Sequence, residues 1–229
     1  RRSREVRLTL GEARANRLRI AWAAAPAPPA PRVLGVQAFD PWPLDDLVGY
    51  IDWTPFFATW ELRGAYPRIF DDPERGATAR QLHADALALL DLIVREGLLT
   101  AKAAVGFWPA NATPDDDLVL WAGERRAVEV ARVPALRQQM AKPDGRPNLA
   151  ISDFVGPAGV PDHVGAFAVT AGHGLDALVR EREAAHDDYG AIMAKALADR
   201  LAEALAERLH ERGRRELWGY APDEALDND

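Results

Sequence analysis

The sequence predicts an α+β domain in which helices at both ends of the chain flank a mainly antiparallel sheet. Three observations support this fold class. Apolar residues recur at intervals of three and four between residues 78 and 96, short β-like runs follow between 103 and 170, and helical periodicity returns from 176 to 218. Short turn-rich segments join the first β-like runs. Such connections suit antiparallel neighbours, because parallel strands need a long crossover.

The N-terminal part is interpreted as an accessory segment before the main domain. Leu10–Leu18 predicts a short helix, and the proline-rich stretch Ala23–Pro31 predicts an extended strap or a plain linker. We therefore expect residues 1–34 to form this helix and strap, and residues 35–229 to form the main domain. The sequence opens with Arg1-Arg2-Ser3-Arg4 and has no initiator Met, so we expect it to be part of a longer protein.

Capping residues and periodicity place the helices of the main domain. Thr54-Pro55 resembles a helix start, with Thr54 as the N-cap residue and Pro55 at the first helical position. The next helix is predicted over Thr78–Glu96, with a glycine directly after it as a stop. The helical region Asp176–Trp218 has an expected break near Gly190. Its second half carries one apolar stripe, formed by Ile192, Leu197, Leu201, Leu205 and Leu209.

Five short runs rich in apolar residues predict the strands. The first three are expected to be antiparallel neighbours, and the last is nearly all apolar, so we expect it to be the central strand. The runs are Ala103–Trp108, Leu118–Trp121, Val128–Val133, Leu149–Val155 and Val164–Thr170.

Composition excludes several classes of function. Hydrophobic residues make up 48% of the 229 residues and include seven Trp, so the chain can bury a sizeable core. A net charge of −7 argues against nucleic acid and anionic membrane as main partners. The sequence has no Cys, which removes disulfides and thiolate chemistry and fits a cytoplasmic protein. No apolar run approaches the roughly 18 residues that a membrane span needs.

Two motifs that mimic functional sites have simpler interpretations. Gly172–Ala177 resembles the dinucleotide-binding Gly-x-Gly-x-x-Ala fingerprint, but no later strand ends in an acidic residue for the ribose. We interpret it as a glycine turn with Asp176 near a helix N-terminus, which also disfavours an independent methyltransferase. His186-Asp187-Asp188 is interpreted as solvated polar surface. No metal site is predicted, because no metal-ligand spacing occurs among His83, His163, His173, His186 and His210.

A series of motifs resembles the activation domain of cobalamin-dependent methionine synthases, the domain that reactivates the enzyme. The likeness covers nearly everything from about Gly35 to the end of the chain. It begins with Tyr50-Ile51-Asp52-Trp53-Thr54-Pro55-Phe56-Phe57 and Tyr66-Pro67-Arg68-Ile69. It continues with Val105–Asn111, Asp116-Asp117-Leu118, Leu136–Gln139, Ser152–Val155, Val164–Thr170, His186–Tyr189, Lys195–Glu203 and Trp218–Pro222.

The resemblance implies the following function. The parent enzyme, a 5-methyltetrahydrofolate–homocysteine methyltransferase, methylates homocysteine through a cobalamin held by a neighbouring module. When that cobalamin is oxidised to cob(II)alamin, the activation domain caps the cobalamin module and binds S-adenosylmethionine for reductive methylation. A flavodoxin-type donor supplies the electron. We expect no catalytic residue in this chain and no activity of the chain alone, because the cofactor performs the difficult chemistry.

Two acidic residues match positions that the family uses on S-adenosylmethionine. The resemblance places Asp52 at the ammonium group of the ligand, where a charge-assisted hydrogen bond is strong. From the residues alone, a local cap of the turn before Thr54 is the favoured role of Asp52. The resemblance also makes Glu203 a ligand residue. Spacing alone puts Glu203 away from the apolar stripe, on a solvated acidic face with Asp199 and Glu207.

In the family, an Arg-x-x-x-Gly-Tyr-Pro segment that clasps S-adenosylmethionine follows the Trp-Gly-Tyr-Ala-Pro motif. This sequence ends at Asp227-Asn228-Asp229 before such a segment, so we expect a truncated domain that binds the ligand more weakly than a longer chain. The alternative is a stand-alone interaction module that caps a cobalamin protein without binding S-adenosylmethionine. Four arginines near the end of the last helix suit its dipole, and we also predict that they steer the acidic electron donor. They are Arg208, Arg212, Arg214 and Arg215.

Overall fold

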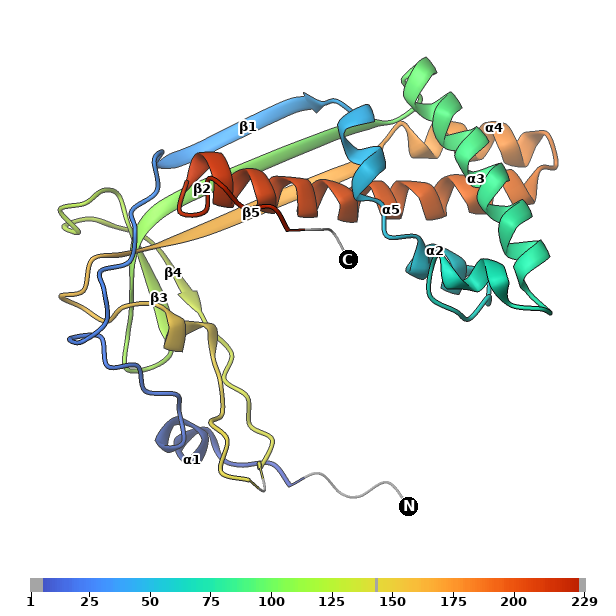
Figure 1. Cartoon of the computed structure of the whole chain (residues 1–229). Helices are drawn as coiled ribbons and strands as arrows, with labels where there is room; N and C mark the ends of the chain where they lie inside the picture. The colour runs from blue at the N-terminus through green and yellow to red at the C-terminus, as the bar shows by residue number, and fades with distance from the viewer. Residues whose placement is uncertain (1–5, 143, 227–229) are drawn as a thin grey trace. The chain divides into compact units, whose positions relative to one another are not determined.

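The computed structural model describes residues 6–142 and 144–226. The predictions drawn from residues 1–4 and 227–229 therefore lie outside the described residues. The α-helices in Figure 1 are α1 (Leu10–Ala15), α2 (Trp53–Thr59), α3 (Gly76–Glu96), α4 (Leu175–Ala184) and α5 (Asp188–Arg212). The strands are β1 (Gly35–Trp42), β2 (Thr100–Ala112), β3 (Asp117–Trp121), β4 (Glu129–Pro134) and β5 (Asp162–His173). Short 3-10 helices are η1 (Asp45–Tyr50), η2 (Arg68–Asp71) and η3 (Ile151–Phe154), and η4 (Gly213–Leu217) is a π-helical turn.

The described residues form two compact units, and β1, β2 and β5 contribute residues to both. The first unit takes its residues from Arg1–Val36, Gly106–Ala166 and Leu217–Tyr220. The second takes them from Gln37–Val105, Phe167–Glu216 and Ala221–Asp229. The candidate site described below belongs entirely to the second unit.

The sheet confirms the predicted fold class. β2 and β3 pair antiparallel with Ala110 opposite Leu120, and β3 and β4 pair antiparallel with Leu118 opposite Val133. The prediction that the last strand is central was wrong, because β2 hydrogen-bonds to β1, β3 and β5. At 13 residues β2 is long enough to accept different partners along its length.

The expected strand over Leu149–Val155 was wrong, because part of it forms η3 instead. The carboxylate of Asp153 accepts a hydrogen bond from the Ala150 N–H at 3.0 Å, which favours a turn over an extended backbone. The same carboxylate receives two hydrogen bonds from Arg137, at 2.6 and 2.8 Å. A local side-chain bond has therefore overridden the apolar pattern of this segment.

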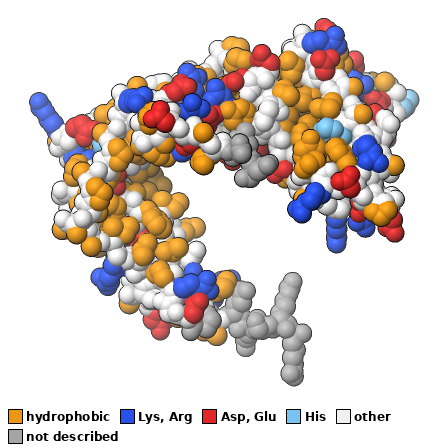
Figure 2. Space-filling model, viewed as in Figure 1, with side chains coloured by type: hydrophobic (Ala, Val, Ile, Leu, Met, Phe, Trp, Pro, Cys, Tyr) orange, Lys and Arg blue, Asp and Glu red, His pale blue; other side chains and the backbone are white. Residues whose placement is uncertain are grey.

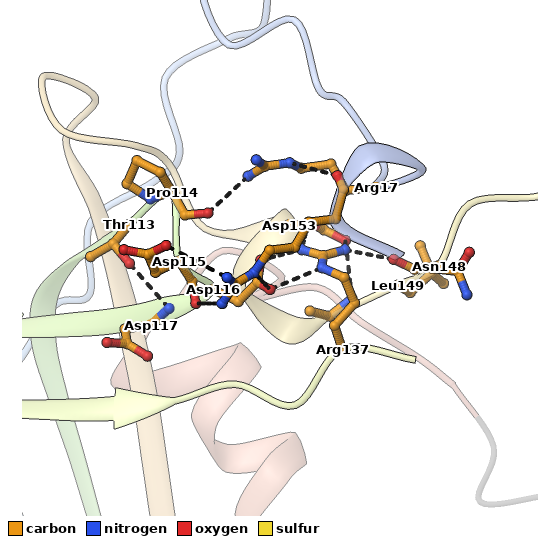
Figure 3. A network of polar contacts seen from close by, with 12 residues as sticks. Arg17, Thr113, Pro114, Asp115, Asp116, Asp117, Arg137, Asn148, Leu149 and Asp153 are labelled. Carbon is orange, nitrogen blue, oxygen red and sulfur yellow. Dashed lines mark hydrogen bonds and ion pairs between the residues drawn. The ribbon is translucent and has the colours of Figure 1, made fainter. Parts of the chain in front are cut away.

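Arg137 is the centre of a buried polar network in the first unit, shown in Figure 3. Its side chain has no exposed surface, and its guanidinium bridges Asp153 and Asp116, with the shortest contact to each at 2.6 Å. Arg14 adds a third hydrogen bond to Asp116, at 2.9 Å, beside the two from Arg137. Burial by itself raises the pKa of Asp116, but the hydrogen bonds from the two arginines outweigh it and hold that pKa below its ordinary value.

The helices of the second unit follow the predicted pattern, apart from local corrections. α3 ends at Gly97, which adopts the left-handed conformation (φ +62°) that glycine favours. The break before α5 lies three residues earlier than Gly190, because the Asp187 carboxylate caps the helix by accepting the Gly190 N–H at 2.8 Å. A Cβ on Gly190 would lie 2.2 Å from Asp187 Oδ2, so glycine allows the cap to approach.

The apolar stripe of α5 is shifted at its start. Leu197, Leu201, Leu205 and Leu209 are at most 1% exposed, as expected. Ile192 was a wrong prediction because it is 45% exposed, and Met193 at 1% exposure takes its place. The buried row therefore repeats every four residues from 193 to 209, which is one face of a helix.

The glycine-rich segment at the end of β5 was interpreted from the sequence as a turn. Gly172–Ala177 is a glycine turn, in which Gly174 has φ +98° and directly precedes α4. A side chain at Gly174 would meet the Leu98 carbonyl oxygen. Within residues 6–142 and 144–226, no three acidic, histidine or cysteine side chains are grouped to hold a metal ion. Over the same residues, no helix is long and apolar enough to cross a membrane.

Candidate functional site: the cleft at the start of α2

A cleft of about 630 Å³ lies where η1 leads into α2 in the second unit. Of the nine residues that line it, Asp52 is the only one with a charged side chain. Aromatic side chains from η1, α2 and the loop before η2 form much of the remaining wall. The lining consists of Val48, Gly49, Tyr50, Ile51, Asp52, Trp53, Thr54, Tyr66 and Pro67.

Asp52, and not Thr54 as predicted, is the N-cap residue of α2. Asp52 Oδ1 accepts a hydrogen bond from the Thr54 N–H at 2.9 Å. Pro55 is accordingly the third helical residue, where its missing N–H leaves no intrahelical bond unmade. Thr54 instead accepts the Tyr66 N–H on its hydroxyl at 3.1 Å, which ties the opposite wall of the cleft to α2.

The capping role does not use the whole Asp52 carboxylate. Asp52 is exposed, and the one hydrogen bond of its carboxylate within the described residues is the capping bond through Oδ1. A carboxylate has room for about four hydrogen bonds on its two oxygens. Asp52 can therefore cap α2 and accept hydrogen bonds from a cationic group in the cleft at the same time.

A buried aromatic cluster supports the floor of the cleft. Trp53 and Phe57 are 7% and 0% exposed, and the Tyr66 ring stacks on Phe57 with centroids 6.4 Å apart. His83 of α3 lies against the Trp53 and Tyr66 rings, at 4.5 and 5.5 Å between centroids. Its Nε2 is buried and has no hydrogen-bond partner among the described residues. Burial without a partner lowers the pKa of His83 below its ordinary value of 6.5.

Glu203 lies on α5 and is not among the residues that line the cleft. As expected, it faces away from the apolar stripe, and its side chain is 61% exposed. Its carboxylate pairs with the nearly buried Arg200 through contacts of 2.6 and 2.7 Å. Arg200 also binds Asp199 at 2.7 Å. The two predicted ligand residues thus belong to one compact unit, but no hydrogen bond or ion pair joins them within the described residues.

Polar contacts that the sequence interpretation did not anticipate tie η1 to α5. The Tyr50 hydroxyl hydrogen-bonds to the Glu211 carboxylate. Arg208 donates to Asp46 and to Glu211, both at 3.1 Å, and its guanidinium lies over the Tyr50 ring, 5.7 Å from the centroid. Tyr50 and Glu211 are 161 positions apart, so no local spacing could have paired them.

The four arginines near the end of α5 and in η4 are paired with carboxylates. Arg208 binds Asp46 and Glu211, and the other three each bind a glutamate at 2.6 to 3.0 Å. These pairs are Arg212–Glu216, Arg214–Glu224 and Arg215–Glu211. Figure 2 shows acidic and basic side chains intermixed over that end of α5. These carboxylates reduce the net positive charge of the arginine cluster. The role of the four arginines in steering an electron donor stays a prediction.

The fold and the sequence together define the class of this protein. The family model described as "vitamin B12 dependent methionine synthase, activation domain" matches residues 43–229, so the chain belongs to that family. A solved structure described as the MetH reactivation domain bound to AdoHcy is similar over almost the whole chain. It has a TM-score of 0.91 and 47% sequence identity, and the match covers 97% of this chain and 68% of that one.

Proposed function

We propose that this chain binds S-adenosylmethionine in the Asp52 cleft and serves in the reactivation of a cobalamin-dependent methionine synthase. The observation that carries the proposal is the similarity to a reactivation domain bound to AdoHcy, at 47% identity. AdoHcy, S-adenosylhomocysteine, is what remains of S-adenosylmethionine after the methyl group has left. A relative that holds the product form supports a site for the donor here.

The residues of the cleft fit such a ligand. S-adenosylmethionine carries an ammonium group and a sulfonium group, so a cleft with a single carboxylate complements its charge. The exposed Asp52 is suited to accept hydrogen bonds from the ammonium group. Aromatic rings attract cations and offer flat surfaces for a nucleobase, and Tyr50, Trp53 and Tyr66 provide them. The volume of about 630 Å³ lies within the roughly 300–1,000 Å³ of ligand sites.

Glu203 is proposed as a second ligand residue on the resemblance alone. Its carboxylate is exposed and points to solvent from α5, so a ligand can reach it. Arg200 restricts the motion of that carboxylate through two hydrogen bonds. The contribution of Glu203 therefore depends on whether the ligand extends from the cleft to α5.

The remaining parts of the proposal concern the parent enzyme. We propose that the chain caps a neighbouring cobalamin module and positions the methyl donor, while a flavodoxin-type protein supplies one electron. Bound S-adenosylmethionine would supply the methyl group for reductive methylation of cob(II)alamin. The residues of this chain would bind and orient the donor.

Calorimetry and a reactivation assay on the intact protein test the proposal. Both S-adenosylmethionine and S-adenosylhomocysteine should bind and compete for one site. Enzyme inactivated by oxidation should regain turnover only when S-adenosylmethionine and a one-electron donor are both present. Reactivation that proceeds without S-adenosylmethionine would contradict the proposal and favour the interaction module.

A further inference from the structure

We propose that Glu211 is a positioning residue for the cleft, and that it acts by holding the Tyr50 phenol. This inference rests on the proposed function, because it assigns a role in the same site. Glu211 is on α5 and does not line the cleft, whereas Tyr50 does. The hydrogen bond between them fixes one wall of the cleft to the longest helix of the second unit.

The tether lies next to the charged residue of the cleft along the chain. Tyr50 is the last residue of η1, and only the buried Ile51 separates it from Asp52. η1 is also anchored at its start, where Asp46 receives hydrogen bonds from Arg208 at 3.1 Å and from Trp42 Nε1 at 3.2 Å. With both ends of η1 attached, the backbone that enters α2 has little freedom to move.

The chemistry of the pair favours a persistent bond. Burial and then the hydrogen bond to Glu211 raise the pKa of Tyr50, which keeps the phenol protonated as a donor. The hydrogen bond from Tyr50 lowers the pKa of Glu211 most. The hydrogen bond from Arg215 and the positive charge of Arg208 lower it further. A neutral phenol that donates to an ionised carboxylate is a charge-assisted hydrogen bond, which is about twice as strong as a neutral one.

The two parts of the Tyr50 side chain therefore have different roles: the hydroxyl holds the wall in place, and the ring faces the cleft. The Tyr50 hydroxyl is directed to Glu211, so its ring is what the cleft presents to a ligand. Preorganising the ring and the adjacent Asp52 before binding lowers the conformational entropy that binding must remove. Loss of the tether should therefore weaken binding even though the lost bond does not touch the ligand.

The chain offers a matched control for this hydrogen bond. Tyr189 donates from its phenol to the Asp85 carboxylate at 2.8 Å, also in the second unit, and neither residue lines the Asp52 cleft. Tyr189→Phe removes the same kind of bond from a different place. A general loss of stability would thus appear in both variants, and a loss of positioning would appear only in Tyr50→Phe.

The experiment measures S-adenosylhomocysteine affinity by calorimetry for the intact protein and its variants. Tyr50→Phe and Glu211→Leu should each weaken binding roughly 3- to 10-fold, and the double variant should be no weaker than either one. Glu211→Gln keeps an acceptor and should retain most of the affinity, and it serves as the milder variant if Glu211→Leu does not fold. Tyr189→Phe should bind like the wild type. Wild-type affinity in Glu211→Leu, or additive losses in the double variant, would overturn the inference.

Hydrogen exchange without ligand keeps this test separate from the proposed function. Backbone amides at residues 51–54 should exchange faster in Tyr50→Phe than in the wild type, and they should be unchanged in Tyr189→Phe. If the wild type binds neither S-adenosyl compound, the proposed function fails, while exchange still decides whether Tyr50 orders the cleft. Unchanged exchange at 51–54 would overturn the inference by itself.

Discussion

Replacing Asp52 by asparagine should separate the two roles that its carboxylate can have at the start of α2. Asparagine caps helices about as well as aspartate, so Asp52→Asn should keep the hydrogen bond to the Thr54 N–H. The lost charge at a helix N-terminus costs about 0.3–1 kcal/mol of stability. Asp52→Ala removes the cap as well and should cost about 0.5–2 kcal/mol from that loss.

The expected effect on binding is larger than the effect on stability. A hydrogen bond to a charged group contributes about 1.5–3 kcal/mol, which corresponds to roughly a 10- to 150-fold loss of S-adenosylhomocysteine affinity. Both Asp52→Asn and Asp52→Ala should show a loss in this range, because both remove the negative charge. Calorimetry measures the affinity, and urea unfolding monitored by Trp fluorescence measures the stability.

Asp187→Asn provides the control for the cap. Asp187 caps α5 through the Gly190 N–H at 2.8 Å and lies outside the Asp52 cleft. This variant should change stability modestly and leave binding unchanged. Wild-type affinity in Asp52→Asn, combined with lower stability in Asp52→Ala, would refute the ligand role and leave Asp52 as a helix cap alone.

Three further predictions follow from the same contacts. Arg137→Met should lower the unfolding free energy by about 3–5 kcal/mol in urea titrations, because it leaves the buried Asp153 carboxylate without its ion-pair partner and leaves Asp116 with Arg14 alone, and a loss under about 1 kcal/mol would contradict this. Since the folded protein disfavours protonated His83, its stability should fall as pH drops below about 6.5 and level off below the lowered pKa. His83→Phe should flatten that slope, and an unchanged pH profile would exclude His83 as the cause. Glu203→Gln should weaken S-adenosylmethionine binding with little effect on stability, and unchanged affinity in calorimetry would leave Glu203 as the partner of Arg200.

The helices and most strands could be predicted because their signals are local. The apolar period of α3 and its terminal glycine lie within one window of sequence, and so do the leucines that form the buried row of α5. The fold class followed from the short connections between β2, β3 and β4. These features depend on neighbouring residues and on periodicity, which a single sequence displays directly.

The errors arose where side chains form bonds that periodicity does not show. An apolar run suggested a strand at residues 149–155, but Asp153 accepts the Ala150 N–H and turns the backbone. Arg137, 16 positions away, binds the same carboxylate. The break predicted near Gly190 was found, but it lies a few residues earlier because Asp187 caps α5 ahead of Gly190. Because of these capping carboxylates, the observed boundary differs from the predicted one by a few residues, and a 3-10 helix forms where a short strand was predicted.

The candidate site was only partly predictable for a related reason. Asp52 was found through a motif, and the structure places it in a cleft. The Tyr50–Glu211 bond joins residues 161 positions apart, and His83 reaches the same region from α3. Such contacts depend on tertiary packing, so a sequence without its fold could not reveal them.

A crystal structure of the intact protein with S-adenosylhomocysteine tests the central claim most directly. The ligand should occupy the cleft between η1 and α2, with its ammonium group within about 3 Å of an Asp52 carboxylate oxygen. The capping bond from Thr54 should remain in place. Ligand bound at another site, or bound in the cleft with its ammonium group away from Asp52, would contradict the account.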